Sequence, residues 1–378
     1  MNLTRDVSSV RDPRDDILDN IASVERAMKK LSGLVLLVWS VLLCAAESPV
    51  LSLPDPISNN AVAILKIHGH FELFSLMGIG PKKTWDAVSN LGYRVDGVSG
   101  KAQVIHAVPG TAGRIGAMAT GADGRIYLLG GFVVYQGGGM PVTDANMYQP
   151  DHDRWIRIAD IPIAVGDSVI GVYRDRYIYL IGGRTTDHLI SEVQMYDLVK
   201  NTWSKATAMP GAPVFGHAGA LVDDTIVYVD GARRNDGAGP KFIPSDECWK
   251  GKIDHHNAAK IEWTKLPNHP GKPAFRIAAG GAEKDPRIYF AGGSDTPYDY
   301  NGVGYDGKPA EPSPTSFAYS LHGEKWELLN DNTPNPTMDH RGLLVTGEGL
   351  VILGGMEKGQ QVTGRIVLLP KPVKTYLQ

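Results

Sequence analysis

Cysteine is scarce in this sequence, which has two cysteines, Cys44 and Cys248, among 378 residues. Cys44 lies in a segment that we expect to be removed, so Cys248 remains alone and no internal disulfide can form in any redox compartment. We expect Cys248, which precedes Trp249, to be a small buried residue and not a nucleophile. The fold must therefore be stabilised by packing.

A large excess of charge is also lacking, because the formal net charge is −3. A broad positive field of the kind that attracts nucleic acid is therefore excluded, and we expect no nucleic-acid partner. Long hydrophobic runs are missing as well. The main apolar segment, residues 31–43, is shorter than the roughly 20 residues that cross a membrane.

Residues 31–43 have instead the length of a signal-peptide core, which is about 7 to 15 residues. Met28-Lys29-Lys30 precede this core, and small residues follow it. We predict an upstream extension over 1–27, a true start at Met28, a signal peptide over 28–46 and a mature chain over 47–378. That mature chain would be periplasmic or secreted, without a membrane span. A lipid anchor on Cys44 is the alternative, although Leu43 stands where lipoprotein signals have Gly or Ala.

Glycine and proline, in contrast, are abundant, with 44 and 25 residues. This composition favours many short strands joined by tight turns, and therefore an all-β fold. Comparison of the sequence with itself finds one unit six times, marked by an apolar strand that ends in two small residues. The markers are residues 71–80, 126–131, 177–183, 226–232, 288–293 and 350–355.

Each marker is followed by a second strand, and in several units by a Tyr and a Trp seven residues apart, as in Tyr196 and Trp203. These units resemble the kelch repeat. The resemblance implies a six-bladed kelch β-propeller over 47–378, with four short antiparallel strands per blade and with the strand at 362–369 closing the ring near Asn59. We expect the doubled glycines to be structural, because a Cβ would clash there. They are Gly130, Gly131, Gly182, Gly183, Gly292, Gly293, Gly354 and Gly355.

One polar residue stands before the innermost strand of each blade, where it would face the mouth of the central channel. Gapless alignment of residues 113–116, 166–169, 216–219 and 275–278 sets this register. Clustered positive charges repel one another unless an acidic group neutralises them, so we predict a binding site at the mouth. The residues are Asn60, Arg114, Asp167, His217, Arg276 and Arg341, with His340 beside the last.

The insertion over 294–307 offers a second candidate, because long loops on a rigid scaffold often carry binding. Its Asp295, Tyr298, Tyr300 and Asn301 suit a sugar ring, so this loop is either a carbohydrate lid or an irregular glycine-rich connection. The sequence gives little indication of a metal site, because neighbouring residues such as His255 and His256 would point to opposite faces of a strand and could not easily bind one ion. We expect no metal and no cofactor.

Within the kelch propellers, the chain resembles the N-acetylneuraminate epimerase (sialic acid mutarotase) family in its signal peptide, its six blades and its single strand after the last glycine pair. Arg114 and Arg341 fall at family arginines, and Arg233 and Arg234 lie near another. Ala232 and Met356 stand where the family has glutamate. The copper site of the galactose oxidases is not matched, since no Tyr-His pair occurs.

Mutarotation needs a base for the anomeric hydroxyl, an acid for the ring oxygen and a cation for a carboxylate. Arg114, Arg276 and Arg341 could hold an acidic sugar, while Asp167 and His217 or His340 exchange protons. Three functions remain open: a sugar mutarotase (an isomerase), a carbohydrate-binding protein without catalysis, and a scaffold that binds a protein partner.

Overall fold

The computed structural model describes residues 51–372, whose regular structure is β-strand apart from three single 3-10 turns. These turns are η1 (Trp85–Ala87), η2 (Pro150–His152) and η3 (Lys358–Gln360). Within this part of the chain, no helix has the length and apolarity that a membrane crossing requires. The predicted signal peptide and upstream extension, residues 1–46, lie outside the described residues.

Six antiparallel sheets follow one another along the chain, and they are the six predicted blades. The first three contain β1 (Ala61–Ile67), β2 (His70–Ile79), β3 (Val88–Asp96) and β4 (Ala102–Ile105); β5 (Met118–Ala122), β6 (Arg125–Leu129), β9 (Ala145–Gln149) and β10 (Arg154–Arg157); and β11 (Val169–Tyr173), β12 (Tyr177–Ile181), β13 (Val193–Asp197) and β14 (Thr202–Ala206). The last three contain β15 (Ala218–Val222), β16 (Thr225–Val229), β19 (Cys248–Ile253) and β20 (Ile261–Leu266); β21 (Ala278–Gly281), β22 (Arg287–Ala291), β23 (Ser316–Ser320) and β24 (Lys325–Asn330); and β25 (Leu344–Val345), β26 (Leu350–Glu357) and β27 (Gln361–Leu369).

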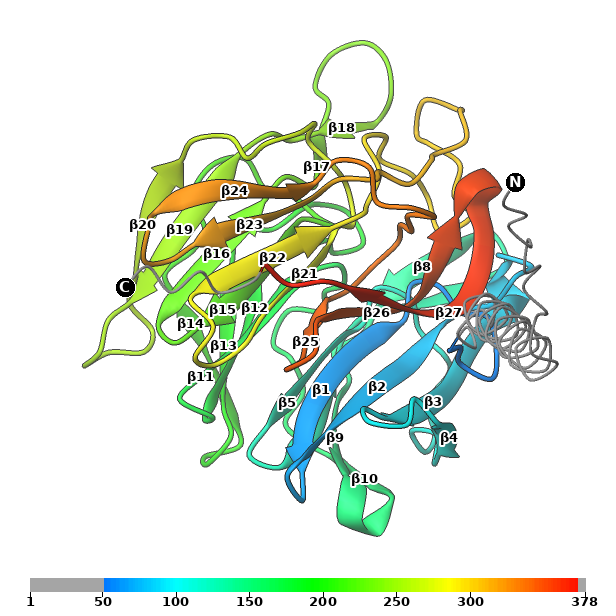
Figure 1. The fold of residues 1–378 in the computed structure, drawn as a ribbon, viewed down its shortest axis with the longest axis vertical. Helices are drawn as coiled ribbons and strands as arrows, with labels where there is room; N and C mark the ends of the chain where they lie inside the picture. The colour runs from blue at the N-terminus through cyan, green and yellow to red at the C-terminus, as the bar shows by residue number, and fades with distance from the viewer. Residues whose placement is uncertain (1–50, 373–378) are drawn as a thin grey trace, which may run out of the picture. The chain divides into compact units, whose positions relative to one another are not determined.

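The first strands of the six blades form a closed ring. Each of β1, β5, β11, β15, β21 and β25 contacts the first strand of the next blade, and a contact between β25 and β1 completes the circle. In Figure 1 the blue first blade accordingly lies beside the red strands of the last one. The ring encloses a channel of about 1020 Å³, lined by residues of all six first strands.

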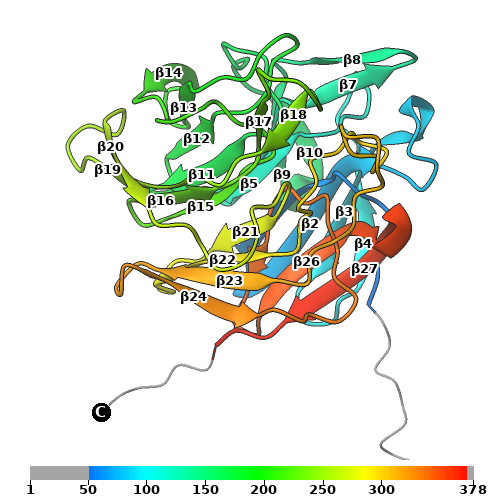
Figure 2. The same ribbon diagram turned by 90° about the horizontal axis from the view of Figure 1, so that it is seen from above.

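Two further hairpins interrupt the blades between their second and third strands. They are β7 (Phe132–Tyr135) with β8 (Gly138–Pro141) in the second blade, and β17 (Ala232–Arg234) with β18 (Phe242–Pro244) in the fourth (Figure 2). The insertion that follows β22 meets the second of these hairpins, because the rings of Phe242 and Tyr305 lie 4.9 Å apart. The connections between second and third strands therefore share one face of the propeller.

Strand burial explains why the repeat markers read as continuous apolar runs. All five residues of β16 are buried, as are the last four of β12. A second strand is covered on both faces by neighbouring blades, so its residues need not alternate between apolar and polar. The Tyr and Trp pair serves the same packing. Tyr196 and Trp203 lie 5.0 Å apart, and the Trp203 indole donates a hydrogen bond to Ala159 O of the preceding segment at 2.8 Å.

The glycine pairs have the predicted left-handed backbone, for example φ of 62° and 107° at Gly182 and Gly183. A Cβ on Gly183 would lie 2.7 Å from Gly166 O, so the segment that leads into β11 of the same blade leaves no room for one. In the first blade the predicted marker is misplaced: Met77 and Gly78, not Ile79 and Gly80, have this conformation, with φ of 58° and 108°.

The ring is closed by the N-terminal segment of the described chain. Leu53 N donates to Gly364 O of β27 at 2.7 Å, and Ile366 N donates to Leu51 O at 2.8 Å. The last sheet has three strands of its own, so this segment supplies its outer edge. The predicted meeting of the C-terminal strand with the N-terminal region is confirmed, and it runs from Leu51 to Ile57, whose N donates to Thr363 O of β27 at 3.2 Å, just before Asn59.

Candidate functional site

Six equivalent residues, one per blade, lie at the end of the channel on the face that carries the hairpins. Each directly follows a residue that forms an isolated β-bridge to its own blade, and each has φ between 54° and 72°. Four of the six are not glycine, although a non-glycine residue in this region is uncommon and often marks a functional or strained site. The six residues are Asn59, Gly116, Asp167, Gly216, Arg276 and Asp339.

Backbone hydrogen bonds join these positions from blade to blade. Asp167 N donates to Gly116 O at 2.9 Å, Gly216 N donates to Asp167 O at 3.0 Å, and Arg276 N donates to Gly216 O at 2.8 Å. Gly116 N is satisfied by the Asn59 side chain at 2.6 Å. The left-handed conformation therefore allows these main-chain hydrogen bonds to form from blade to blade around the axis. We call them the belt of main-chain bonds, and they hold the side chains in fixed positions.

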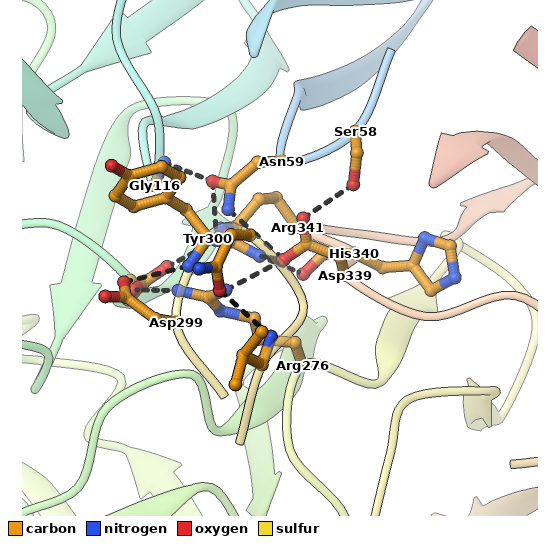
Figure 3. Close-up of polar contacts among 12 residues, drawn as sticks. Ser58, Asn59, Gly116, Arg276, Asp299, Tyr300, Asp339, His340 and Arg341 are labelled. Atoms are coloured by element: carbon orange, nitrogen blue, oxygen red, sulfur yellow. Dashed lines mark hydrogen bonds and ion pairs between the residues drawn. The ribbon is translucent and has the colours of Figure 1, made fainter. Parts of the chain in front are cut away.

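Two arginines, Arg276 and Arg341, meet two aspartates, Asp167 and Asp339, inside this belt. Figure 3 labels Arg276, Asp339 and Arg341 of this group. Arg276 donates to Asp167 at 3.1 Å and to Asp339 at 2.9 Å, and Arg341 lies 2.7 Å from Asp167 and 3.5 Å from Asp339. All four side chains are at most 5% exposed. Burial alone would raise the pKa of Asp167, but Arg276 and Arg341 outweigh it and hold that pKa below its ordinary value. The channel end is thus filled by a neutral ion network.

The predicted register of the mouth residues is wrong in part. Asp167 and Arg276 are two of the six equivalent residues. Asn60 and His217 come one residue after the equivalent residues of their blades, Asn59 and Gly216, and Arg341 comes two residues after Asp339. Arg114 comes two residues before Gly116. The alignment of Gly113 with Gly166 fails because the glycine that adopts the left-handed backbone in the second blade is Gly116.

Arg114 lies apart from the other two predicted arginines. Its guanidinium donates to Gly130 O at 2.9 Å and to Asp144 O at 3.4 Å. It is 1% exposed, and burial lowers its pKa to about 10. Asn60 also bonds within the fold, to Ser75 Oγ at 2.8 Å and Leu353 O at 3.1 Å.

His217 and His340 line the channel and are buried. Burial lowers the pKa of each to about 4, so both imidazoles are neutral at pH 7. Within residues 51–372, neither ring nitrogen of His217 has a hydrogen-bond partner, and the same holds for His340 Nε2.

The insertion after β22 covers the ion network instead of standing open as a lid. The Tyr298 ring is fully buried, packs on Phe275 at 5.2 Å, and lies 5.2 Å below the Arg276 guanidinium. The remaining predicted binding residues make local contacts. Asp295 pairs with Lys272 at 3.0 Å, Tyr300 N donates to Asp299 at 2.8 Å, and Asn301 accepts from Val303 N at 2.9 Å. Figure 3 includes Asp299 and Tyr300 of this loop.

A separate cavity of about 320 Å³ lies on the same face, between the loops of the third and fourth blades. Four cations line it, Arg184, Arg233, Arg234 and Lys241, and none of them has an ion-pair partner among the described residues. The Arg184 guanidinium lies 5.5 to 5.8 Å from the rings of Phe132, Phe215 and Phe242. Asp187, His188 and Asp236 add polar groups to the lining.

Of these lining residues, sequence analysis named Arg233 and Arg234. Arg184 was missed although it carries a usable signal: it directly follows the Gly182-Gly183 marker, where the equivalent residues Ile79, Phe132, Ala232, Ser294 and Met356 are uncharged. Asp339 was missed because its partners Arg276 and Ser58 are remote in sequence, and only the ring brings them together.

Comparison with known proteins gives consistent matches. The Kelch motif model matches residues 172–210. Kelch-like protein terF of Aspergillus terreus is 32% identical over 173 residues, which cover 45% of this chain and 33% of that protein. Kelch-like protein 15 of Danio rerio is 22% identical over 61% of this chain and 37% of its own length, so the chain spans about a third of these curated relatives. Among solved structures, that of YjhT superposes with a TM-score of 0.69 at 18% identity, covering 86% of this chain and 98% of YjhT.

Proposed function

Because the chain is a kelch-repeat propeller, whose blades hold a rigid face of loops, we propose that it binds a small acidic sugar in the cationic cavity between the third and fourth blades. The observation that carries the proposal is Arg184. Its guanidinium faces three phenyl rings and has no carboxylate partner among the described residues.

The charge of the cavity favours an anionic ligand. Four cations and two carboxylates line it, which leaves an excess of positive charge on a partly enclosed surface. The phenyl rings fix the plane of the Arg184 guanidinium and reduce its contact with water, so a bidentate bond to a ligand carboxylate would be strong.

The size and the walls of the cavity favour a monosaccharide. Ligand cavities usually measure about 300 to 1,000 Å³, and this one, at about 320 Å³, suits a single sugar ring. Leu189, Pro213 and Phe242 offer apolar surface for the sugar carbons, while Asp187 and His188 can bond hydroxyls. The resemblance to the sialic acid mutarotases favours the same class of ligand.

The channel-mouth arginines suit this role less well. Arg276 and Arg341 already share Asp167 and Asp339, so a ligand carboxylate would have to displace a buried internal one. A carboxylate held by two guanidinium groups is also a weak base. If the protein turns the sugar over, Asp187 and His188 are the titratable groups of the cavity that could exchange protons at the anomeric centre.

Calorimetric titration with N-acetylneuraminate, glucuronate and galacturonate tests the proposal. We expect the wild type to bind at least one acid and Arg184→Ala to weaken that binding roughly 10- to 150-fold, since a charge-assisted pair contributes about 1.5 to 3 kcal/mol. Arg184→Lys should recover part of the loss, and Arg154→Ala, which removes an exposed arginine on β10, should bind as the wild type does. If no acid binds, or if Arg184→Ala binds equally well, the proposal is wrong. If an acid does bind, the rate of exchange between its anomers, measured by NMR with and without the protein, distinguishes a mutarotase from a binding protein.

A protein scaffold is the second candidate, favoured by exposed apolar residues on the same face. Trp85, Tyr135 and Met140 are 46%, 50% and 52% exposed, and η1, which contains Trp85, contacts β7. Such residues mark interaction surfaces when they cluster. This function would require that no acidic sugar binds and that Tyr135→Ser combined with Met140→Ser abolishes capture of a defined protein partner.

A further inference from the structure

Three potential metal ligands come together between the fourth and fifth blades, away from the cationic cavity. Asp230 directly follows β16, Cys248 begins β19, and His269 lies between β20 and β21. One ligand atom of each lies within 4.8 Å of the others, and all three residues are buried. Sequence analysis did not connect them, because 39 residues separate Asp230 from His269.

The His269 ring is held in one orientation. Its Nδ1 lies 2.8 Å from Pro270 O, and a carbonyl can only accept, so Nδ1 carries a proton. The ring stacks on Phe317 with a centroid distance of 4.1 Å and an interplanar angle of 4°. Nε2 therefore points at Asp230, 2.8 Å from Oδ2. A histidine that donates through one nitrogen to a carbonyl and presents the other to a carboxylate has the arrangement of an oriented metal ligand.

Asp230 is incompletely satisfied without a further partner. Its Oδ2 accepts from Ala274 N at 2.8 Å and from His269, but Oδ1 has no hydrogen-bond partner among the described residues. The residue is 1% exposed, so water does not compensate for the missing bond. An unpaired buried carboxylate oxygen is costly, and a cation would remove that cost.

The local sequence also departs from the repeat at this position. Asp230 has φ of 61°, where the second, third, fifth and sixth blades have Gly130, Gly182, Gly292 and Gly354 with φ of 56° to 72°. A Cβ placed at Gly130 would face Ile161 Cδ1 at 3.3 Å, so the second blade has an apolar contact where the fourth has Asp230 and His269. The fold accepts backbone strain in order to put a carboxylate here.

We infer that Asp230, Cys248 and His269 form a buried structural site for a divalent transition-metal ion of the zinc class. Nitrogen, sulfur and carboxylate oxygen are the donors that zinc takes, so each of the three side chains can supply one ligand. Asp230 can bind through one oxygen, or through both in a distorted geometry, because its oxygens are only about 2.2 Å apart. Ligands around tetrahedral zinc stand roughly 3.3 to 3.7 Å apart, so the contact between Nε2 and Oδ2 would open by about half an ångström. Binding would release the thiol proton of Cys248 and the proton on Nε2.

The site is enclosed by both blades, so we expect the ion to enter during folding. The full-length chain is unfolded in guanidinium with a chelator and refolded with or without ZnCl₂, and its zinc is then measured by mass spectrometry. We expect about one zinc ion per chain after refolding with zinc. Cys248→Ser should lower the zinc content at least roughly tenfold. Cys44→Ser, which removes the other cysteine, should keep the content of the wild type.

Refolding with Co²⁺ supplies a readout specific to the thiolate. We expect a sulfur-to-cobalt charge-transfer band in the wild type and in Cys44→Ser, and none in Cys248→Ser. The inference is overturned if the wild type refolded with zinc holds no more zinc than the sample refolded without it, or if the band is missing from the wild type. Both of these results are measured on the wild type, so the test remains valid even if Cys248→Ser does not fold. The cluster would then be a buried His and Asp pair only.

Discussion

Arg276 of the fifth blade and Asp167 of the third are 109 residues apart in the chain, yet their side chains meet at 3.1 Å inside the belt of main-chain bonds. Asp339 takes the other terminal nitrogen of Arg276 at 2.9 Å. One guanidinium therefore connects the third, fifth and sixth blades on the axis. The pairing links the channel end to the stability of the whole ring.

Removal of Arg276 should destabilise the propeller strongly. Arg276→Met leaves Asp167 and Asp339 with Arg341 alone, and breaking a buried pair from one side costs about 3 to 5 kcal/mol of unfolding free energy. Arg154→Met, at an exposed position on β10, should change stability by less than about 0.5 kcal/mol. Urea unfolding of the two variants measures the difference. Equal midpoints would mean that the network contributes no net stability.

Stability should fall on mild acidification because of the two channel histidines. Burial lowers the pKa of His217 and His340 to about 4, below the value of about 6.5 expected in the unfolded chain. The unfolded state therefore binds more protons between these values, so the stabilisation is complete above pH 6.5 and is lost progressively down to about pH 4. His217→Phe should flatten this part of the curve, whereas His70→Gln, at the exposed first residue of β2, should not. Urea unfolding at pH 7.5, 6, 5 and 4 tests the slope.

A side chain at the second glycine of a marker should disrupt the close packing of that glycine against the segment that precedes the first strand of its blade. Gly183→Val puts a β-branched residue at φ of 107°, where its Cβ would lie 2.7 Å from Gly166 O. We expect a loss of several kcal/mol, on the order of 3 or more. Gly347 has no atom within 4 Å of its Cβ direction and no positive φ, so Gly347→Val is the matched control. Similar melting temperatures for the two variants would contradict the assigned role of the marker.

Export should remove the chain up to Ala46 and leave Leu51 to Leu53 in place on β27. We therefore predict that the mature protein, produced in a Gram-negative host, begins near Glu47 and melts as a complete ring. N-terminal sequencing of the periplasmic fraction measures the cleavage point. A mature chain that keeps residues 1–27, or a lipid on Cys44, would contradict the prediction.

The structure places the predicted mouth residues at the expected position in some blades and not in others, and the reason is geometric. Asp167 and Arg276 could be placed because both stand directly before an apolar strand and both take the equivalent left-handed position. Arg114 has the same appearance in sequence, but its side chain turns to Gly130 O. A shift of two residues keeps the strand pattern while sending the side chain elsewhere, and sequence spacing alone does not detect such a shift.

The sequence by itself determined the six blades, because a doubled small residue after an apolar strand, repeated at near-regular intervals, satisfies the same local backbone and packing demands each time. Only the tertiary structure decided which charges meet. Arg276 pairs with Asp167 and Asp339, and Arg184 lies near three phenyl rings with no carboxylate partner within residues 51–372. Ring closure causes both arrangements, because it sets distances between residues that are remote along the chain. Those charges act over a few ångströms, and no local pattern in the sequence records such a distance.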